Sequence, residues 1–144
     1  MTTRQNCVLK YALDHFAGAQ PDEVFAVFED GAIWTWAETR DRTRRMAAAL
    51  QRLGIGQGDH VVAWLPNGPQ ALITFFAINY IGAVHVPINT AYRGSLLAHV
   101  VENSDATLII AHAQLVPRLA EIDRAKLATV IFAGDKPGAI DGLS

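Results

Sequence analysis

From residue 59 onward, short apolar runs alternate with segments of helical length. The apolar runs have the length of buried strands and cover residues 60–65, 83–88, 106–111 and 128–132. The segments between them are predicted to be helices, the last of them short and amphipathic, over residues 69–81, 94–103 and 115–122. Strands that alternate with helices predict a parallel sheet with right-handed crossovers. Uninterrupted apolar strands indicate that helices cover both faces, so the predicted fold class is α/β with a doubly wound, mainly parallel sheet.

A different pattern precedes this layer. Residues 9–16 have helical spacing, and residues 24–28 and 32–35 are predicted to form a short antiparallel β ribbon around the turn Glu29-Asp30-Gly31. Thr35 and Glu38 then have the spacing of a capping box, which predicts a helix that ends at Gly54. The expected organisation is residues 1–58 with a helix, a ribbon and a capped helix, followed by the parallel layer in residues 59–144.

Composition excludes several classes of protein. A chain of 144 residues with 51% hydrophobic and 18% charged residues is not intrinsically disordered. The net charge of -2 argues against a nucleic-acid partner, and the single cysteine excludes an intrachain disulfide. The most apolar stretch, residues 71–86, is interrupted by polar side chains and is too short for a membrane span. Because the N-terminus is polar and lacks the apolar run of a signal peptide, we expect a cytoplasmic protein.

The common nucleotide-binding and nucleophile motifs do not fit this chain. The glycines of residues 54–58 follow a predicted helix and precede a strand, which is the reverse of the dinucleotide-binding arrangement. They are interpreted as a helix stop and a tight turn. No phosphate-binding loop with its Lys-Ser/Thr ending and no Gly-x-Ser-x-Gly elbow occurs.

Two groups of basic residues have a simple structural interpretation. The capped helix carries four arginines, which are Arg40, Arg42, Arg44 and Arg45. They form either a phosphate-binding patch or a solvated face with acidic partners. We favour the solvated face, because Glu38–Arg42 and Asp41–Arg45 are i,i+4 pairs. Among the histidines, His60 and His85 lie in apolar strands and are expected to be satisfied core or interface residues. His99 and His112 have no acid or nucleophile nearby in the sequence.

One set of polar residues follows the predicted strands, at the sheet edge where parallel α/β proteins bind ligands. It consists of Pro66, Asn67, Asn89, Thr90 and His112. The set contains neither a nucleophile with its base nor a phosphate cradle, so these residues alone specify no reaction. The sequence offers no catalytic residue and no metal-ligating cluster.

The order of several segments, taken together, resembles the N-terminal part of AMP-forming acyl-CoA synthetases, members of the adenylate-forming superfamily. The matching segments are Ile33-Trp34-Thr35-Trp36-Ala37-Glu38, Leu53-Gly54-Ile55-Gly56-Gln57-Gly58-Asp59-His60-Val61-Val62, Leu65-Pro66-Asn67, Gly82-Ala83-Val84-His85-Val86-Pro87-Ile88-Asn89 and His99-Val100-Val101-Glu102-Asn103-Ser104-Asp105-Ala106. Thr90 and the pair Leu96-Leu97 depart from residues that are frequent in the family. The resemblance implies that the chain is one incomplete N-terminal subdomain of a larger adenylate-forming fold.

This resemblance implies a two-step ligase that uses ATP, Mg²⁺ and CoA. A carboxylic acid substrate attacks the α-phosphate of ATP to form an acyl-adenylate, and the CoA thiol then displaces AMP. The family's phosphate loop, nucleotide contacts, magnesium-binding acid and C-terminal domain are expected beyond Ser144. The chain alone is therefore expected to be an inactive scaffold that binds these cofactors poorly.

The resemblance also implies one ligand contact. Arg93 follows the Pro-Ile-Asn strand, in the loop where some family members carry a basic residue near the CoA phosphates; a solvated loop arginine is the alternative. The expected partner is the remainder of the ligase, or a second copy that associates through the exposed sheet. The all-round apolar segment of residues 70–81 favours this view over a self-sufficient, non-catalytic α/β binding module.

Overall fold

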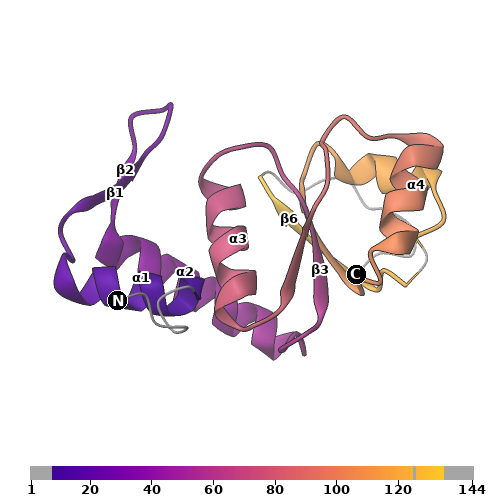
Figure 1. Ribbon diagram of the computed structural model, residues 1–144. Coiled ribbons are helices and arrows are strands. Elements are labelled where there is room, and N and C mark those ends of the chain that lie inside the picture. Colours follow the sequence, from indigo (N-terminus) through magenta and orange to yellow (C-terminus); the bar gives the residue numbers. More distant parts are fainter. Residues whose placement is uncertain (1–7, 125, 135–144) are drawn as a thin grey trace.

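The computed structural model describes residues 8–124 and 126–134 (Figure 1). Its N-terminal elements are α1 (Leu9–Ala19), β1 (Val24–Val27), β2 (Ile33–Thr35) and α2 (Trp36–Arg52). β1 and β2 pair as the predicted antiparallel ribbon, with Val27 opposite Ile33. At the turn between them, the Asp30 carboxylate accepts a hydrogen bond of 3.0 Å from the Ala32 amide.

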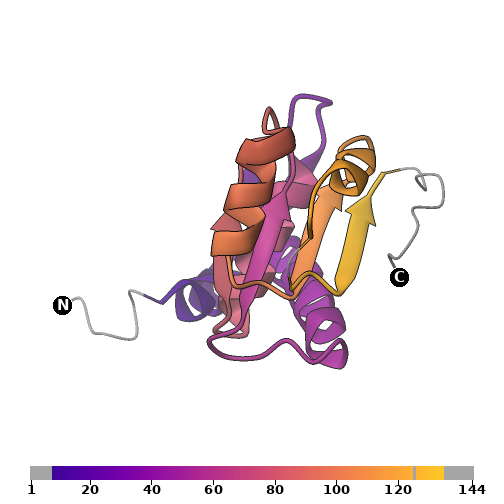
Figure 2. The same ribbon diagram turned by 90° about the vertical axis from the view of Figure 1, so that its right-hand side faces the viewer.

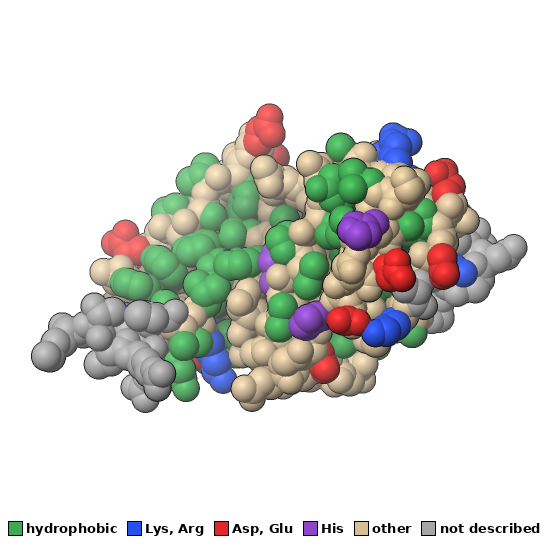
Figure 3. All heavy atoms as spheres, turned by 45° about the vertical axis from the view of Figure 1, so that its right-hand side comes forward, with side chains coloured by type: hydrophobic (Ala, Val, Ile, Leu, Met, Phe, Trp, Pro, Cys, Tyr) green, Lys and Arg blue, Asp and Glu red, His purple; other side chains and the backbone are tan. Residues whose placement is uncertain are grey.

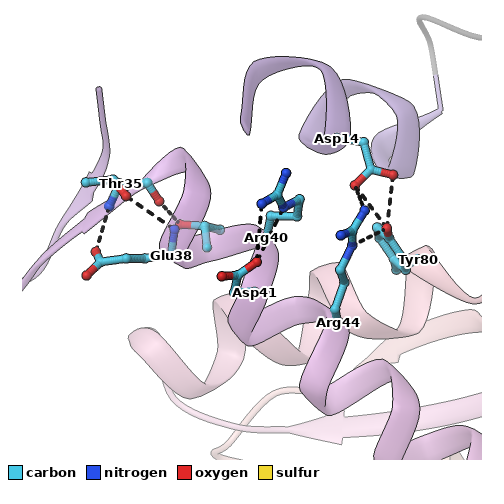
Figure 4. A network of polar contacts seen from close by, with 8 residues as sticks. Asp14, Thr35, Glu38, Arg40, Asp41, Arg44 and Tyr80 are labelled. Carbon is cyan, nitrogen blue, oxygen red and sulfur yellow. Dashed lines mark hydrogen bonds and ion pairs between the residues drawn. The ribbon is translucent and has the colours of Figure 1, made fainter. Parts of the chain in front are cut away.

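The predicted capping box starts α2. The Thr35 hydroxyl accepts a hydrogen bond of 3.2 Å from the Glu38 amide, and the Glu38 carboxylate accepts one of 3.0 Å from the Thr35 amide (Figure 4). Two backbone donors that the first turn leaves without partners are thereby satisfied. Since α2 ends at Arg52 and the next strand begins at His60, the glycines of residues 54–58 lie in a helix-to-strand turn, as predicted.

The second part of the chain forms one parallel sheet. Its elements are β3 (His60–Trp64), α3 (Pro69–Tyr80), β4 (Val84–Pro87), α4 (Gly94–Asn103), β5 (Leu108–His112), the 3₁₀ helix η2 (Val116–Glu121) and β6 (Thr129–Ala133). The strand order is β4-β3-β5-β6, and every neighbouring pair is parallel. β3 is therefore an inner strand, while β6 lies at one edge (Figure 2).

Helices cover both faces of this sheet, which confirms the doubly wound α/β prediction. Figure 1 shows α3 and α4 on opposite sides of the strands. Alternate residues of β3 supply the two cores: Val61 packs with Leu50 of α2 and Ile78 of α3, whereas Val62 packs with residues of α4 and η2. This alternation follows from the two-residue period of a strand.

The short amphipathic helix predicted over residues 115–122 is present as the 3₁₀ helix η2, Val116–Glu121, rather than as an α-helix. Its buried residues Val116 and Leu119 are three positions apart, which matches the three residues per turn of a 3₁₀ helix. A segment of six residues is also too short to repay the cost of nucleating an α-helix.

A polar network ties the N-terminal helices to α3 (Figure 4). Arg44 of α2 donates hydrogen bonds to the Tyr80 hydroxyl of α3 and to Asp14 of α1, both at 2.9 Å, and the Tyr80 hydroxyl donates to Asp14. Burial raises the pKa of Tyr80, so the phenol keeps its proton and acts as a donor. Arg44 therefore holds three helices together rather than a phosphate.

The i,i+4 pairs predicted along α2 are not formed within the described residues. Glu38 is held in the capping box, and Asp41 pairs with its neighbour Arg40 at 3.4 Å. Arg42 instead lies over the ring of Trp34, with its guanidinium carbon 4.5 Å from the ring centroid. A capping contact and an aromatic face compete successfully with exposed ion pairs, which contribute little.

Candidate functional site

An open pocket of about 620 Å³ lies at the carboxyl ends of β3 and β4, beside α3. The loops that follow the two strands contribute its amide and hydroxyl groups, β4 contributes an imidazole, and α3 contributes an apolar wall that includes Phe75. Parallel strands bring these loops to one end of the sheet, because each strand points in the same direction. Two loops that are distant in sequence thus meet at a single site.

Four of the five residues predicted at the strand ends line this pocket: Pro66, Asn67, Asn89 and Thr90. His112 is not part of its lining. It ends β5, on the other side of β3, and its Nδ1 accepts a hydrogen bond of 3.3 Å from the Gln114 amide. The prediction had no information on strand order, which decides which of these ends are neighbours.

The lining of the pocket contains no charged side chain. Aliphatic and aromatic side chains alternate with amide, hydroxyl and imidazole groups, a composition suited to an uncharged part of a ligand. Asn89 also has a structural role, because its Oδ1 accepts a hydrogen bond of 2.8 Å from the Ala91 amide and so fixes the turn after β4.

His85 is the titratable residue of this pocket. It lies on β4 opposite Val61 and contacts Phe75 edge-to-face, with ring centroids 5.3 Å apart. Burial lowers the pKa of His85 below its ordinary value of 6.5, since the surroundings disfavour the charged ring. The imidazole is therefore neutral at neutral pH.

The shift in His85 predicts a dependence of stability on pH. Between the lowered folded-state pKa and 6.5 the unfolded chain binds more protons, so the free energy of unfolding falls as the pH drops through 6.5. His85→Gln removes this contribution, and the variant should lose less stability than the wild type between about pH 7.5 and about pH 5.5. Urea-induced unfolding at the two pH values measures the difference. Identical losses in the two proteins would contradict the assignment.

His60 and His99 form contacts with protein groups outside the pocket. The Nδ1 atom of His60 lies 2.6 Å from the Ser104 carbonyl oxygen, which confirms the expectation of a satisfied strand histidine. His99 contacts Asn103 one turn later in α4.

Arg93, predicted to contact CoA phosphates, is exposed at the N-cap position of α4. Its backbone is extended, and its carbonyl accepts a hydrogen bond of 3.3 Å from the Leu97 amide. Its side chain forms no ion pair with any other residue that the structure describes. No carboxylate of the described residues therefore occupies the guanidinium, whose planar donors suit an anion.

A second arginine near this loop was missed from the sequence. Arg118 of η2 donates a hydrogen bond of 2.7 Å from Nη1 to the Thr90 carbonyl oxygen. Within the sequence the only signal is a basic residue in an amphipathic segment, and nothing there connects it with Thr90.

Within residues 8–124 and 126–134, no three His, Cys, Asp or Glu residues gather into a group that could hold a metal ion. No helix among the same residues is both long and apolar enough to cross a membrane.

Comparison with known proteins identifies the family. The sequence matches the family described as AMP-binding enzyme over residues 13–141, and the chain belongs to this family. The chain is 31% identical over 143 residues to a crotonobetaine/carnitine–CoA ligase from Salmonella paratyphi B; this match covers 94% of the chain but only 28% of the relative. The resemblance to adenylate-forming acyl-CoA ligases is confirmed, and the chain spans little more than a quarter of that relative's length.

Solved structures share the fold. The N-terminal domain of FACL13 from Mycobacterium tuberculosis, solved with an inhibitor, aligns with a TM-score of 0.79 at 26% identity and covers 87% of this chain and 33% of that one. A long-chain-fatty-acid–CoA ligase from Archaeoglobus fulgidus aligns with a TM-score of 0.81 over 94% of this chain and 29% of its own; at 23% identity this match supports the fold alone.

Proposed function

We propose that the chain is the N-terminal part of an ATP-dependent acid–thiol ligase that makes acyl-CoA. The observation that carries the proposal is the 31% identity to a CoA ligase along 94% of the chain. In the first step a carboxylate oxygen bonds to the α-phosphorus of ATP and pyrophosphate leaves. In the second step the CoA sulfur bonds to the acyl carbon, its proton is released, and AMP leaves.

ATP and Mg²⁺ do not fit the residues described. The pocket at the carboxyl ends of β3 and β4 is lined without charge, and the described residues hold no group of metal ligands. A triphosphate with its magnesium ion needs cations and carboxylates that this set does not supply. We therefore assign both to the remainder of the ligase, and the chain to a scaffold that is inactive alone.

For CoA, unlike ATP and Mg²⁺, the described residues do offer a binding group. The exposed Arg93 guanidinium can bind a phosphate with two parallel hydrogen bonds. Arg93 belongs to the same loop as Asn89 and Thr90, which line a pocket suited to an uncharged group. We propose that Arg93 contacts a phosphate of the CoA nucleotide. Its role is binding, since the reacting sulfur is at the other end of CoA.

The exposed apolar side chains of the N-terminal elements support a scaffold over a self-sufficient binding module. Hydrophobic side chains gather in the left half of the face in Figure 3. On the ribbon itself, Val24, Val27 and Ile33 are 54%, 67% and 54% exposed. Such surface favours coverage by the remainder of the ligase, or by a second copy of the chain. Light scattering on the 144-residue chain distinguishes the two alternatives. A self-sufficient module would be a monodisperse monomer, whereas a scaffold with an uncovered apolar surface would self-associate.

The function is tested on the protein encoded by the complete gene, read beyond the codon for Ser144. Incubated with ATP, Mg²⁺, CoA and short, medium-chain, aromatic or carnitine-like acids, it should release AMP and pyrophosphate and form a thioester with at least one acid. Mass spectrometry of the thioester and an AMP assay measure the two products. Absence of turnover with every acid, or release of ADP instead of AMP, would refute the proposal.

A further inference from the structure

The loop between β4 and α4 is held by two side chains that come from distant parts of the sequence. The Trp64 indole at the end of β3 donates a hydrogen bond of 3.0 Å to the Asn89 carbonyl oxygen. Arg118 donates one of 2.7 Å to the next carbonyl oxygen, that of Thr90. Two consecutive backbone acceptors of this loop are therefore bound by side chains outside it.

Arg118 is well placed for this contact. Its own element, η2, is anchored in the core by Val116 and Leu119, so the base of the side chain is fixed. Its guanidinium carbon lies 5.8 Å from the centroid of the buried Trp64 ring, and its side chain forms no ion pair with the other described residues. A charged donor without a carboxylate partner forms a strong hydrogen bond to a neutral carbonyl.

The loop is also ordered from within. The Tyr92 amide donates a hydrogen bond of 3.1 Å to the Asn89 carbonyl oxygen, and the Tyr92 side chain packs against the core. Between Asn89 and Tyr92, Thr90 is the residue whose carbonyl is bound by Arg118. Arg93 follows Tyr92 directly, so the position of the Arg93 backbone depends on the conformation of residues 89–92.

We propose that Arg118 is a positioning residue, which fixes the Thr90 carbonyl so that the loop presents Arg93 to its phosphate in a single arrangement. The inference rests on the proposed function for the identity of the ligand, but the loop contact itself does not. A loop that is already ordered loses less conformational freedom when it binds. Arg118 acts through Thr90 and does not itself touch CoA.

The functional test uses the full-length ligase with Arg118→Met, which keeps an apolar stem beside Trp64 but removes the donors. We expect the KM for CoA to rise about tenfold, with kcat and the rate of ATP–pyrophosphate exchange within about twofold of the wild type. Arg118→Lys, whose ammonium can still donate to Thr90, should recover part of the KM. Arg52→Met serves as a control, because Arg52 is exposed at the end of α2, before the amino end of β3. An unchanged KM for CoA in Arg118→Met would overturn the proposal.

A second measurement does not depend on activity. Hydrogen exchange of the ligand-free full-length protein should be faster in Arg118→Met for peptides that contain Ala91 and Tyr92, and unchanged for peptides from β5. Unchanged exchange in the loop peptides would overturn the positioning role whatever the kinetics. If the wild-type enzyme made no thioester, the proposed function would fail. The exchange measurement would still decide whether Arg118 orders the loop.

Discussion

Replacing Trp64 with alanine is expected to lower the free energy of unfolding by about 3–5 kcal/mol. Trp64 is 0% exposed and packs in the core between the sheet, α4 and η2. The substitution removes an indole ring from close-packed surroundings and takes away the N–H donor of the Asn89 carbonyl oxygen. Such a loss is a large share of the 5–15 kcal/mol that stabilises a typical domain. Chemical unfolding followed by circular dichroism measures it.

Trp36→Ala is the matched control for this prediction. Trp36 is half-buried at the start of α2, where it contacts Phe16 and Phe25 with ring centroids 4.7 Å and 4.6 Å apart. The chemical change is the same, but less surface is lost from the interior, so the destabilisation should be smaller. If Trp36→Ala were as damaging as Trp64→Ala, the main core would not be centred on Trp64.

The second large effect concerns Arg93. In the full-length ligase, Arg93→Glu should raise the KM for CoA by at least about tenfold, because a carboxylate repels the phosphate that the guanidinium attracts. Formation of the acyl-adenylate, measured by ATP–pyrophosphate exchange, should be unaffected, since CoA enters only in the second step. Steady-state kinetics with varied CoA and saturating acid and ATP measure the change.

The control for Arg93 is the same reversal of charge at Arg52, another exposed arginine. α2 ends at Arg52 and the chain then leads to the amino end of β3. Arg52 therefore lies toward the opposite end of the strands from the pocket, which is at their carboxyl ends. Arg52→Glu should leave the KM for CoA unchanged. Equal KM values in the wild type and Arg93→Glu would assign Arg93 to the solvated surface.

The secondary structure could be predicted from the sequence because its signals are local. β3, predicted over residues 60–65, extends from His60 to Trp64, and the capping box of Thr35 and Glu38 starts α2 as expected. The opposite positions of α3 and α4 follow from right-handed crossovers to either side of β3. The pocket residues Asn67 and Asn89 could be predicted for the same reason, as parallel strands end at one edge.

Contacts between distant segments could not be predicted. The order β4-β3-β5-β6 separates His112 from the pocket, and no local pattern encodes that order. Arg118 reaches Thr90 across 28 positions of sequence, and Arg44 reaches Tyr80 across 36. Arg42 was assigned to Glu38 by spacing, but the ring of Trp34 is the partner in the folded chain. Tertiary packing selects among several local pairings of similar energy.

The central position of β3 has a consequence for how the protein is made. A ribosome releases β3 and then its first neighbour, β4, whereas the strand on the other side, β5, begins only at Leu108. Because a ribosome adds about 5–20 residues per second, the second edge of β3 stays unpaired for a few seconds before β5 emerges. During that interval Val61 and Val62 belong to an open strand edge that other nascent chains can pair with. Chaperone binding during synthesis is therefore most useful to this protein between the emergence of Pro87 and that of His112.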